Sequence, residues 1–250
     1  MKPVSLGAAW LETVAFIKRE AGLLVPAILL FIAVPLIAIL LAVPPQMREM
    51  PAGSEPAAVE IGDGVIFLVT GGMLVMFGGL LVCFALALKP GISMGEALKL
   101  GFRRLPVALG AALIMALAVM VPAVVMASVS KVAADFAVVI AAMLISARMI
   151  FVNALIVDRP VGVIESVRQS WNLSRGQFGR LLLCLVAIAI PTLLSQAVAG
   201  MLLGLPVIAF AGAEAGARAT DAAGAIVMAL GQMVLAVMTS RLYRQLVPAS

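Results

Sequence analysis

Histidine is absent from this 250-residue sequence, and charged residues make up only 12% of it. Without an imidazole, the chain lacks the usual base of a nucleophilic triad and one of the common metal ligands. Its twelve acidic residues show no spacing typical of a metal site, and no glycine-rich phosphate loop is present. Cys83 and Cys184 both lie in apolar runs, which favours packed side chains over a disulfide or a metal pair. These absences predict a protein without catalytic activity of its own and without a cofactor.

Long apolar runs dominate what the sequence does contain. Hydrophobic residues make up 64% of the chain, whereas they account for roughly half of a soluble domain. Runs of about 20 apolar residues can cross about 30 Å of hydrocarbon as helices, and their lack of alternation argues against barrel strands. The sequence therefore predicts an all-α integral membrane protein. Its six transmembrane helices are expected near Leu23–Val43, Gly64–Leu88, Leu105–Val129, Ala133–Val157, Leu181–Leu205 and Ala222–Ser240.

Lysines and arginines divide unequally between the two sides that these helices define. One side carries Lys2, Lys18, Arg19, Lys89, Lys99, Arg103, Arg104, Arg159, Arg168, Arg175, Arg180, Arg241 and Arg244, and the other carries Arg48, Lys131 and Arg218. Short cytoplasmic loops of membrane proteins carry the excess of positive charge, so both termini are predicted to be cytoplasmic. The cations are spread over four segments beside the spans. This distribution indicates contact with anionic inner-leaflet lipids of a bacterial cytoplasmic membrane, and no nucleic-acid partner.

Two short stretches, EALKLGF at 96–102 and ESVRQSW at 165–171, share one order of residue types: Glu, small, apolar, basic, any, small, aromatic. A fainter copy begins at Leu6, 88 residues before Met94. Each copy precedes a pair of predicted spans. The pattern predicts a single membrane domain, residues 1–250, of three units near 4–88, 93–157 and 162–240. Each unit is expected to be a short cytoplasmic interfacial amphipathic helix followed by a transmembrane hairpin, the first hairpin having an exposed outer loop over residues 44–63.

The spacing of the apolar residues predicts which face of each interfacial helix is covered. Positions i, i+3, i+4, i+7 and i+8 share one side of a helix. Ser93 followed by Glu96 is a capping-box signature that predicts where the second of these helices begins. The expected apolar faces are Leu6, Ala9, Trp10, Thr13, Val14 and Ile17 in the first copy, Met94, Ala97, Leu98, Gly101 and Phe102 in the second, and Val163, Ile164, Val167, Ser170, Trp171 and Ser174 in the third.

The segment ARMIFVNALIVDRPVGVIESVRQSWNLSRGQFGRLLL carries the most distinctive pattern of the chain. It contains Arg148, Pro160, the Ser170–Trp171 pair, Gly176 and Arg180. Over roughly residues 140–190 it resembles the membrane domain associated with bacterial glycerophosphoryl diester phosphodiesterases, and related six-span bacterial proteins of unknown function. The resemblance implies a helical membrane architecture and a lipid-related setting. It does not imply the hydrolase activity, which in that family belongs to a soluble domain that these 250 residues do not contain.

Arg148 is the one cation inside a predicted span, nine residues from the inner end of that span. This is about 13 Å of helix, too deep for the side chain to snorkel comfortably to water, and leaving it unpaired would cost about 2.5–3.5 kcal/mol. Gln232 is predicted at a similar depth and is a candidate hydrogen-bond acceptor. A local water defect reaching Asn153 and Asp158 is the alternative. Arg148 is thus expected either to anchor the helix bundle or to form a site for a lipid phosphate or another anion.

Charged and aromatic residues on the interfacial helices form a second candidate site, a cytoplasmic docking surface for a protein partner. Its residues are Glu165, Arg168, Ser170, Trp171, Glu96, Lys99 and Phe102. Three hypotheses for function follow. The first is a non-catalytic lipid-associated scaffold or partner subunit, the second is a transporter component with spans kinked by proline, and the third is a membrane-bound lipid phosphodiester hydrolase.

Overall fold

The computed structural model describes residues 4–43, 62–128 and 130–247, and every regular element in these ranges is a helix. The predicted all-α class is therefore confirmed for this part of the chain, whereas most of the predicted outer loop at 44–63 lies outside it. The elements are α1 (Leu6–Ile28), η1 (Leu29–Ala33), α2 (Val34–Ala42), α4 (Asp63–Leu88), α5 (Met94–Ala127), α6 (Lys131–Arg148), α7 (Val152–Asp158), α8 (Val163–Leu173), α9 (Phe178–Ala211) and α10 (Ala213–Leu246).

Six helical segments are long and apolar enough to cross a membrane, as the sequence predicts. Their bounds are Leu6–Ala42, Asp63–Leu88, Met94–Ala127, Lys131–Asp158, Phe178–Ala211 and Ala213–Leu246. Most of them extend beyond the predicted spans, because helical structure continues into the flanking polar residues that hydropathy alone excludes. Length and composition thus identify the chain as a multi-pass membrane protein.

The first segment contains a π-helical turn, η1, between α1 and α2. The Val34 amide donates to the Leu29 carbonyl five residues earlier, instead of four. Pro35 follows directly, and its ring nitrogen has no hydrogen to donate. A wider turn ahead of a proline accommodates the missing hydrogen bond without ending the helix. Helical structure runs from Leu6 to Ala42 without a gap, so no turn separates the first predicted interfacial helix from its span.

The second predicted interfacial helix is also continuous with its span, because α5 runs unbroken from Met94 to Ala127. Its start agrees with the sequence. The Ser93 hydroxyl accepts from the Glu96 amide at 3.3 Å, and the Glu96 carboxylate accepts from the Ser93 amide at 3.0 Å. The capping box is therefore confirmed. Only the third copy forms a helix of its own, α8, and a turn separates this helix from α9.

The fourth span, predicted at Ala133–Val157, coincides with a candidate span at Lys131–Asp158, but it is not one continuous helix. The structure ends α6 at Arg148 and begins α7 at Val152, with a turn between them. Five of the seven residues of α7 are buried. The sequence has neither proline nor glycine at this break, so local chemistry does not cause it. The chain turns here because α7 packs into the centre of the molecule against α4, α5, α8 and α10.

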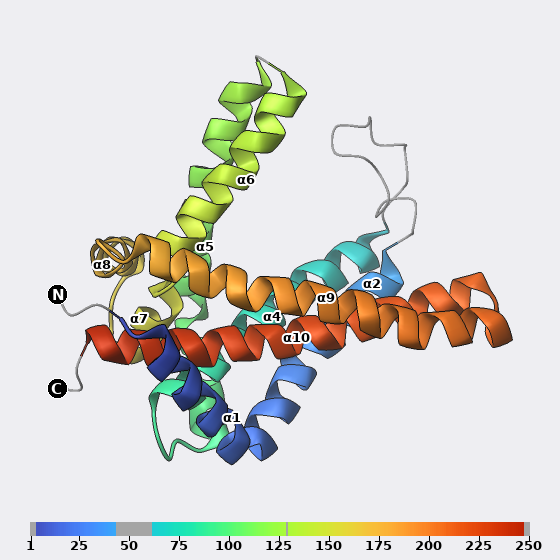
Figure 1. Ribbon diagram of the computed structural model, residues 1–250, viewed down its shortest axis with the longest axis horizontal. Coiled ribbons are helices and arrows are strands. Elements are labelled where there is room, and N and C mark those ends of the chain that lie inside the picture. Colours follow the sequence, from blue (N-terminus) through green and yellow to red (C-terminus); the bar gives the residue numbers. More distant parts are fainter. Residues whose placement is uncertain (1–3, 44–61, 129, 248–250) are drawn as a thin grey trace.

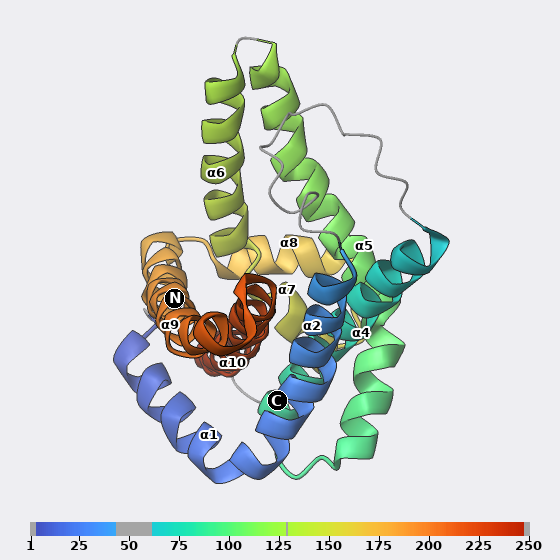
Figure 2. The same cartoon turned by 90° about the vertical axis from the view of Figure 1, so that its right-hand side faces the viewer.

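The helices form a central core from which two helix pairs extend in different directions. The centre consists of the second half of α4, where Leu81–Leu88 are all buried, together with α7 and the buried stretch Ala236–Tyr243 of α10. α5 and α6 lie side by side and project away from the long α9–α10 pair (Figures 1 and 2). α1 packs on α10, and the chain then turns back towards α2, giving the V shape in Figure 2.

Small residues at equivalent positions of the three sequence copies are all buried. They are Ala9 and Thr13 in α1, Ala97 and Gly101 in α5, and Ser166 and Ser170 in α8. Small side chains at these positions let each helix lie close to its neighbour. Trp10 and Ile164, which the predicted apolar faces include, are instead 47% and 76% exposed. The covered face of each copy is therefore narrower than the apolar pattern suggests, and its centre is occupied by small residues.

Hydrogen bonds hold the two ends of the described chain together. The Ser5 amide donates to Gln245 Oε1 at 2.8 Å, and Gln245 Nε2 donates to the Ser5 carbonyl at 3.2 Å. The Val4 amide donates to Gln177 Oε1 at 3.1 Å. The start of α1 and the end of α10 accordingly lie on the same side in Figure 1. This closure positions the start of α1 against the turn that leads into α9.

Candidate functional site: Arg148 between two aromatic rings

Arg148 is the last residue of α6, and its guanidinium lies between two aromatic rings. The guanidinium carbon is 5.0 Å from the Trp171 ring centroid on α8 and 5.3 Å from the Phe178 ring centroid at the start of α9. A cation within about 6 Å of a ring centroid is attracted by the quadrupole of the ring. The C-terminal end of α6 adds a favourable dipole for a positive charge. Three helices thus meet at this one side chain.

Ser170, the neighbour of Trp171, holds α8 against the end of α6. Its hydroxyl donates to the Arg148 carbonyl at 2.9 Å, and the Ser170 side chain is fully buried. The last carbonyls of a helix lack partners within the helix, so this hydrogen bond satisfies one of them. The two residues of the Ser170–Trp171 pair therefore both contact Arg148, each in a different way. Ser170 caps α6, and Trp171 is carried to the guanidinium of the same residue.

A cavity of about 440 Å³ opens beside the guanidinium. α5 contributes Ala118 and Pro122, and α6 contributes Ala141, Leu144 and Ile145. Arg148 is the one charged group among the described residues that line it. An apolar cavity with a single charge at one end suits an amphiphile, whose chain would fill the apolar part while its head meets the charge.

The charge of Arg148 has no partner within the described part of the chain. Nη1 is buried and makes no hydrogen bond, and none of the ion pairs found among the described residues includes Arg148. A buried donor that loses water without gaining an acceptor costs about 1–3 kcal/mol, and more when it is charged. The aromatic rings offset part of this cost. The half-buried guanidinium still retains the capacity to bind an anion in the cavity.

Gln232 and Asn153, the predicted companions of Arg148, lie elsewhere. Gln232 lines a different cavity, on the other side of α6, together with residues of α9. Asn153 is half-buried on α7, beyond the break that follows Arg148. The structure therefore brings Arg148 to Trp171 and Phe178 and not to Gln232. Arg148 and Gln232 lie apart because they line cavities on different faces of α6.

The residues of the predicted docking surface fall into two groups. Glu165, Arg168 and Lys99 are exposed, and Glu165 accepts a hydrogen bond from Gln169 at 2.7 Å. Ser170 is buried. Trp171 is engaged with Arg148, and Glu96 caps its own helix. Phe102 packs edge-on against Phe31, 6.3 Å between ring centroids. Four of the seven residues of the predicted surface, Ser170, Trp171, Glu96 and Phe102, thus have a structural role.

Three interactions that hold this region together were not predicted from the sequence. Phe178 is the second ring on Arg148, but a single Phe in an apolar run gives no local signal. The Tyr243 hydroxyl donates to Asp158 Oδ2 at 2.9 Å, which joins the end of α10 to α7. Arg241, which the sequence analysis places among the cations of the cytoplasmic side, is only 8% exposed, and its guanidinium carbon lies 4.3 Å from the Phe16 ring centroid. The single tyrosine of the chain was the one available signal for a polar contact of this kind.

No protein-family model, no curated protein and no solved structure matches this chain. Within the described residues, no group of three or more Cys, Asp or Glu side chains is placed to hold a metal ion. The site is therefore characterised by its own geometry, which consists of one unpaired guanidinium, two rings and an adjoining apolar cavity.

Proposed function

We propose that this chain is a non-catalytic multi-pass protein of the bacterial cytoplasmic membrane that binds an anionic phospholipid at Arg148 and acts as a lipid-associated scaffold or partner subunit. The observation that carries the proposal is the guanidinium of Arg148, which has no anionic partner among the described residues and borders an apolar cavity of about 440 Å³. A lipid phosphate supplies the missing acceptor, and an acyl chain supplies the apolar filling.

The membrane topology that fits this role has three hairpins, cytoplasmic termini and helix ends that lie at the inner surface. The unequal division of Lys and Arg supports the orientation, and the hydrogen bonds between Ser5 and Gln245 keep both ends on one side. In this arrangement α8 lies along the inner surface, with Trp171 at the headgroup level that suits its amphipathic ring. Arg148 then lies at headgroup level as well, where a phosphate is within its reach. The resemblance to membrane domains associated with glycerophosphoryl diester phosphodiesterases supports the same lipid-related setting.

The test is native mass spectrometry of the purified protein after reconstitution into discs that contain phosphatidylglycerol and phosphatidylcholine. The wild type is expected to retain phosphatidylglycerol selectively, and Arg148→Leu should reduce this selective retention roughly 10- to 100-fold, the range for losing one charge-assisted hydrogen bond. Arg175→Leu is the matched control, because it removes an exposed positive charge near the same site and leaves the cavity intact. Equal retention of both lipids by the wild type would refute the proposal.

A second variant separates binding from anchoring. Leu144 lines the cavity and is 48% exposed, so Leu144→Trp would fill the cavity without changing the charge or the core. The lipid site is expected to be lost in this variant while the melting temperature stays close to that of the wild type. If Leu144→Trp keeps the selective lipid and Arg148→Leu fails to assemble, Arg148 is a structural anchor.

A transporter component is the second candidate, favoured by two irregular helices. The π-helical turn η1 and the break between α6 and α7 both interrupt candidate spans. Interrupted spans are common at the substrate sites of secondary transporters. Flux of a substrate in sealed vesicles would establish this function, and the Arg148 variants would then be measured for flux.

A further inference from the structure

A second cavity, of about 420 Å³, lies between α6 on one side and the α9–α10 pair on the other. On α9 its lining follows one stripe of the helix, from Leu182 through Leu185 and Ala189 to Gln196. Fourteen residues of helix correspond to roughly 21 Å, which exceeds the thickness of about 15 Å for half of a bilayer core. The cavity is therefore long enough to hold an extended hydrocarbon chain alongside α9.

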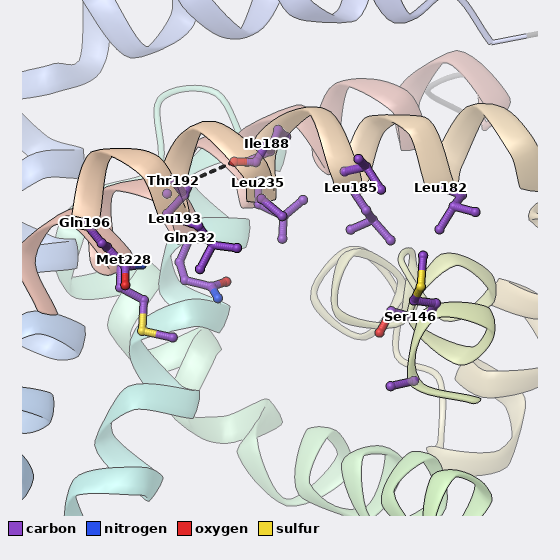
Figure 3. Close-up of a pocket in the computed structure, with 15 residues that line it drawn as sticks. Ser146, Leu182, Leu185, Ile188, Thr192, Leu193, Gln196, Met228, Gln232 and Leu235 are labelled. Atoms are coloured by element: carbon purple, nitrogen blue, oxygen red, sulfur yellow. Dashed lines mark hydrogen bonds between the residues drawn. The ribbon is translucent and has the colours of Figure 1, made fainter. Parts of the chain in front are cut away.

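Uncharged polar side chains project into this apolar cavity from three helices. They are Ser146 on α6, Gln196 on α9 and Gln232 on α10. Figure 3 shows Gln196 and Gln232 on the α9–α10 side of the open space, and Ser146 across it. None of the described residues lining the cavity carries a charge. Its chemistry is thus distinct from that of the cavity at Arg148.

The hydrogen-bonding groups of these three side chains have no partner among the residues that the structure describes. Within the described part of the chain, the carboxamides of Gln196 and Gln232 and the hydroxyl of Ser146 form no hydrogen bond. By contrast, the adjacent Thr192 hydroxyl donates to the Ile188 carbonyl at 2.7 Å. Polar groups facing hydrocarbon are unfavourable unless a partner satisfies them, and in membrane spans they mark functional sites. An occupant made only of hydrocarbon would leave all three unsatisfied.

The geometry points to a binding site for an uncharged lipid with a free hydroxyl group, of the diacylglycerol class. A carboxamide both donates and accepts hydrogen bonds, and so does a hydroxyl, so Gln196 and Gln232 together match a hydroxyl-bearing glycerol end. The apolar stripe that leads from Gln196 back to Leu182 matches an acyl chain. A charged headgroup has no counter-charge here, which argues against an anionic phospholipid in this cavity. The assignment is independent of the lipid proposed at Arg148, since α6 separates the two cavities.

The proposal is tested by photolabelling of the full-length protein in phosphatidylcholine vesicles. Three probes with the same photoactivatable acyl chain are compared: a diacylglycerol, a triacylglycerol that lacks the hydroxyl, and a phosphatidic acid that carries a charge. We expect the diacylglycerol to label the cavity-lining peptides of α9 and α10 roughly tenfold more than the other two, the effect of about two neutral hydrogen bonds. Unlabelled diacylglycerol should compete with this labelling, and unlabelled triacylglycerol should not.

Variants locate the effect at the two carboxamides. The double variant Gln196→Leu/Gln232→Leu keeps side-chain volume and should remove the preference for diacylglycerol. Met228→Leu changes an apolar residue of the same lining and should preserve it. Arg148→Leu should also leave it unchanged, which keeps this test distinct from that of the anionic site. Equal labelling by all three probes in the wild type would show that the cavity holds bulk lipid and would overturn the proposal. Labelling by a water-soluble probe in place of diacylglycerol would show a water-filled opening and would overturn it as well.

Discussion

Gly101 in α5 gives the sharpest prediction about packing in this fold. A Cβ atom at this position would lie 2.8 Å from Val82 Cγ2, 3.0 Å from the Val82 amide nitrogen and 3.2 Å from the Gly78 carbonyl oxygen. Two of these three neighbours belong to the backbone of α4, which cannot rotate away as a side chain can. The substitution Gly101→Ala therefore forces α4 and α5 apart by a few tenths of an ångström.

The expected magnitude follows from two opposing effects. Replacing glycine by alanine within a helix stabilises it by up to about 1 kcal/mol through backbone entropy. Overpacking a close contact typically costs about 1–3 kcal/mol. Gly71 in α4 is the matched control, because a Cβ there meets nothing within 4 Å and only the favourable effect applies. Gly101→Ala should accordingly be about 1–3 kcal/mol less stable than Gly71→Ala.

The assay is reversible unfolding in mixed detergent micelles, followed by circular dichroism, with the three proteins compared under the same conditions. The midpoint for Gly101→Ala should shift to lower denaturant, and that for Gly71→Ala should stay or rise. If both variants are equally stable, then α4 and α5 do not approach as closely as described, and the reasoning from the small residues of the repeated motif fails.

Two further predictions concern hydrogen bonds that join separate helices. Tyr243→Phe removes the hydroxyl that donates to Asp158. Because the acceptor is a carboxylate, the free energy of unfolding should fall by about 1.5–3 kcal/mol. An unchanged unfolding midpoint in the same detergent assay would contradict this prediction. Ser170→Ala removes the hydrogen bond to the Arg148 carbonyl and should lower stability by about 0.5–1.5 kcal/mol. Ser170→Ala should also increase quenching of the Trp171 indole fluorescence by an aqueous quencher, relative to the control Arg168→Ala at an exposed position of the same helix. Identical quenching in the two variants would show that Ser170 does not position the ring.

The two helices at the proposed docking surface illustrate why a sequence pattern can be correct in one respect and incomplete in another. Apolar periodicity identifies Ala97 and Gly101 on the covered side of their helix, and both are buried. The same periodicity assigns Ile164 to a covered side, although 76% of this residue is exposed. In a chain that lies in lipid, an apolar side chain is stable against hydrocarbon as well as against protein. Apolar character alone therefore does not tell which face has a protein neighbour.

The sequence by itself determined those features that depend only on residues near one another along the chain. The all-helical class and the six candidate spans follow from runs of apolar residues, and the start of α5 follows from the capping pair Ser93 and Glu96. Hydropathy and capping act over a few residues, so they can be evaluated without knowing the fold. The presence of one arginine in an otherwise apolar segment also singled out Arg148 as a candidate site residue.

Tertiary structure alone decided where that arginine lies and what surrounds it. The end of α6 at Arg148 has no proline or glycine to cause it, and arises because α7 is buried among four other helices. Trp171 and Phe178 reach the guanidinium from 23 and 30 residues further along the chain, and Gln196 and Gln232 come to one cavity from different helices. Such meetings depend on contacts between distant segments. The sequence specifies these contacts only through the packing of the whole chain, because no local pattern encodes the distance between two helices.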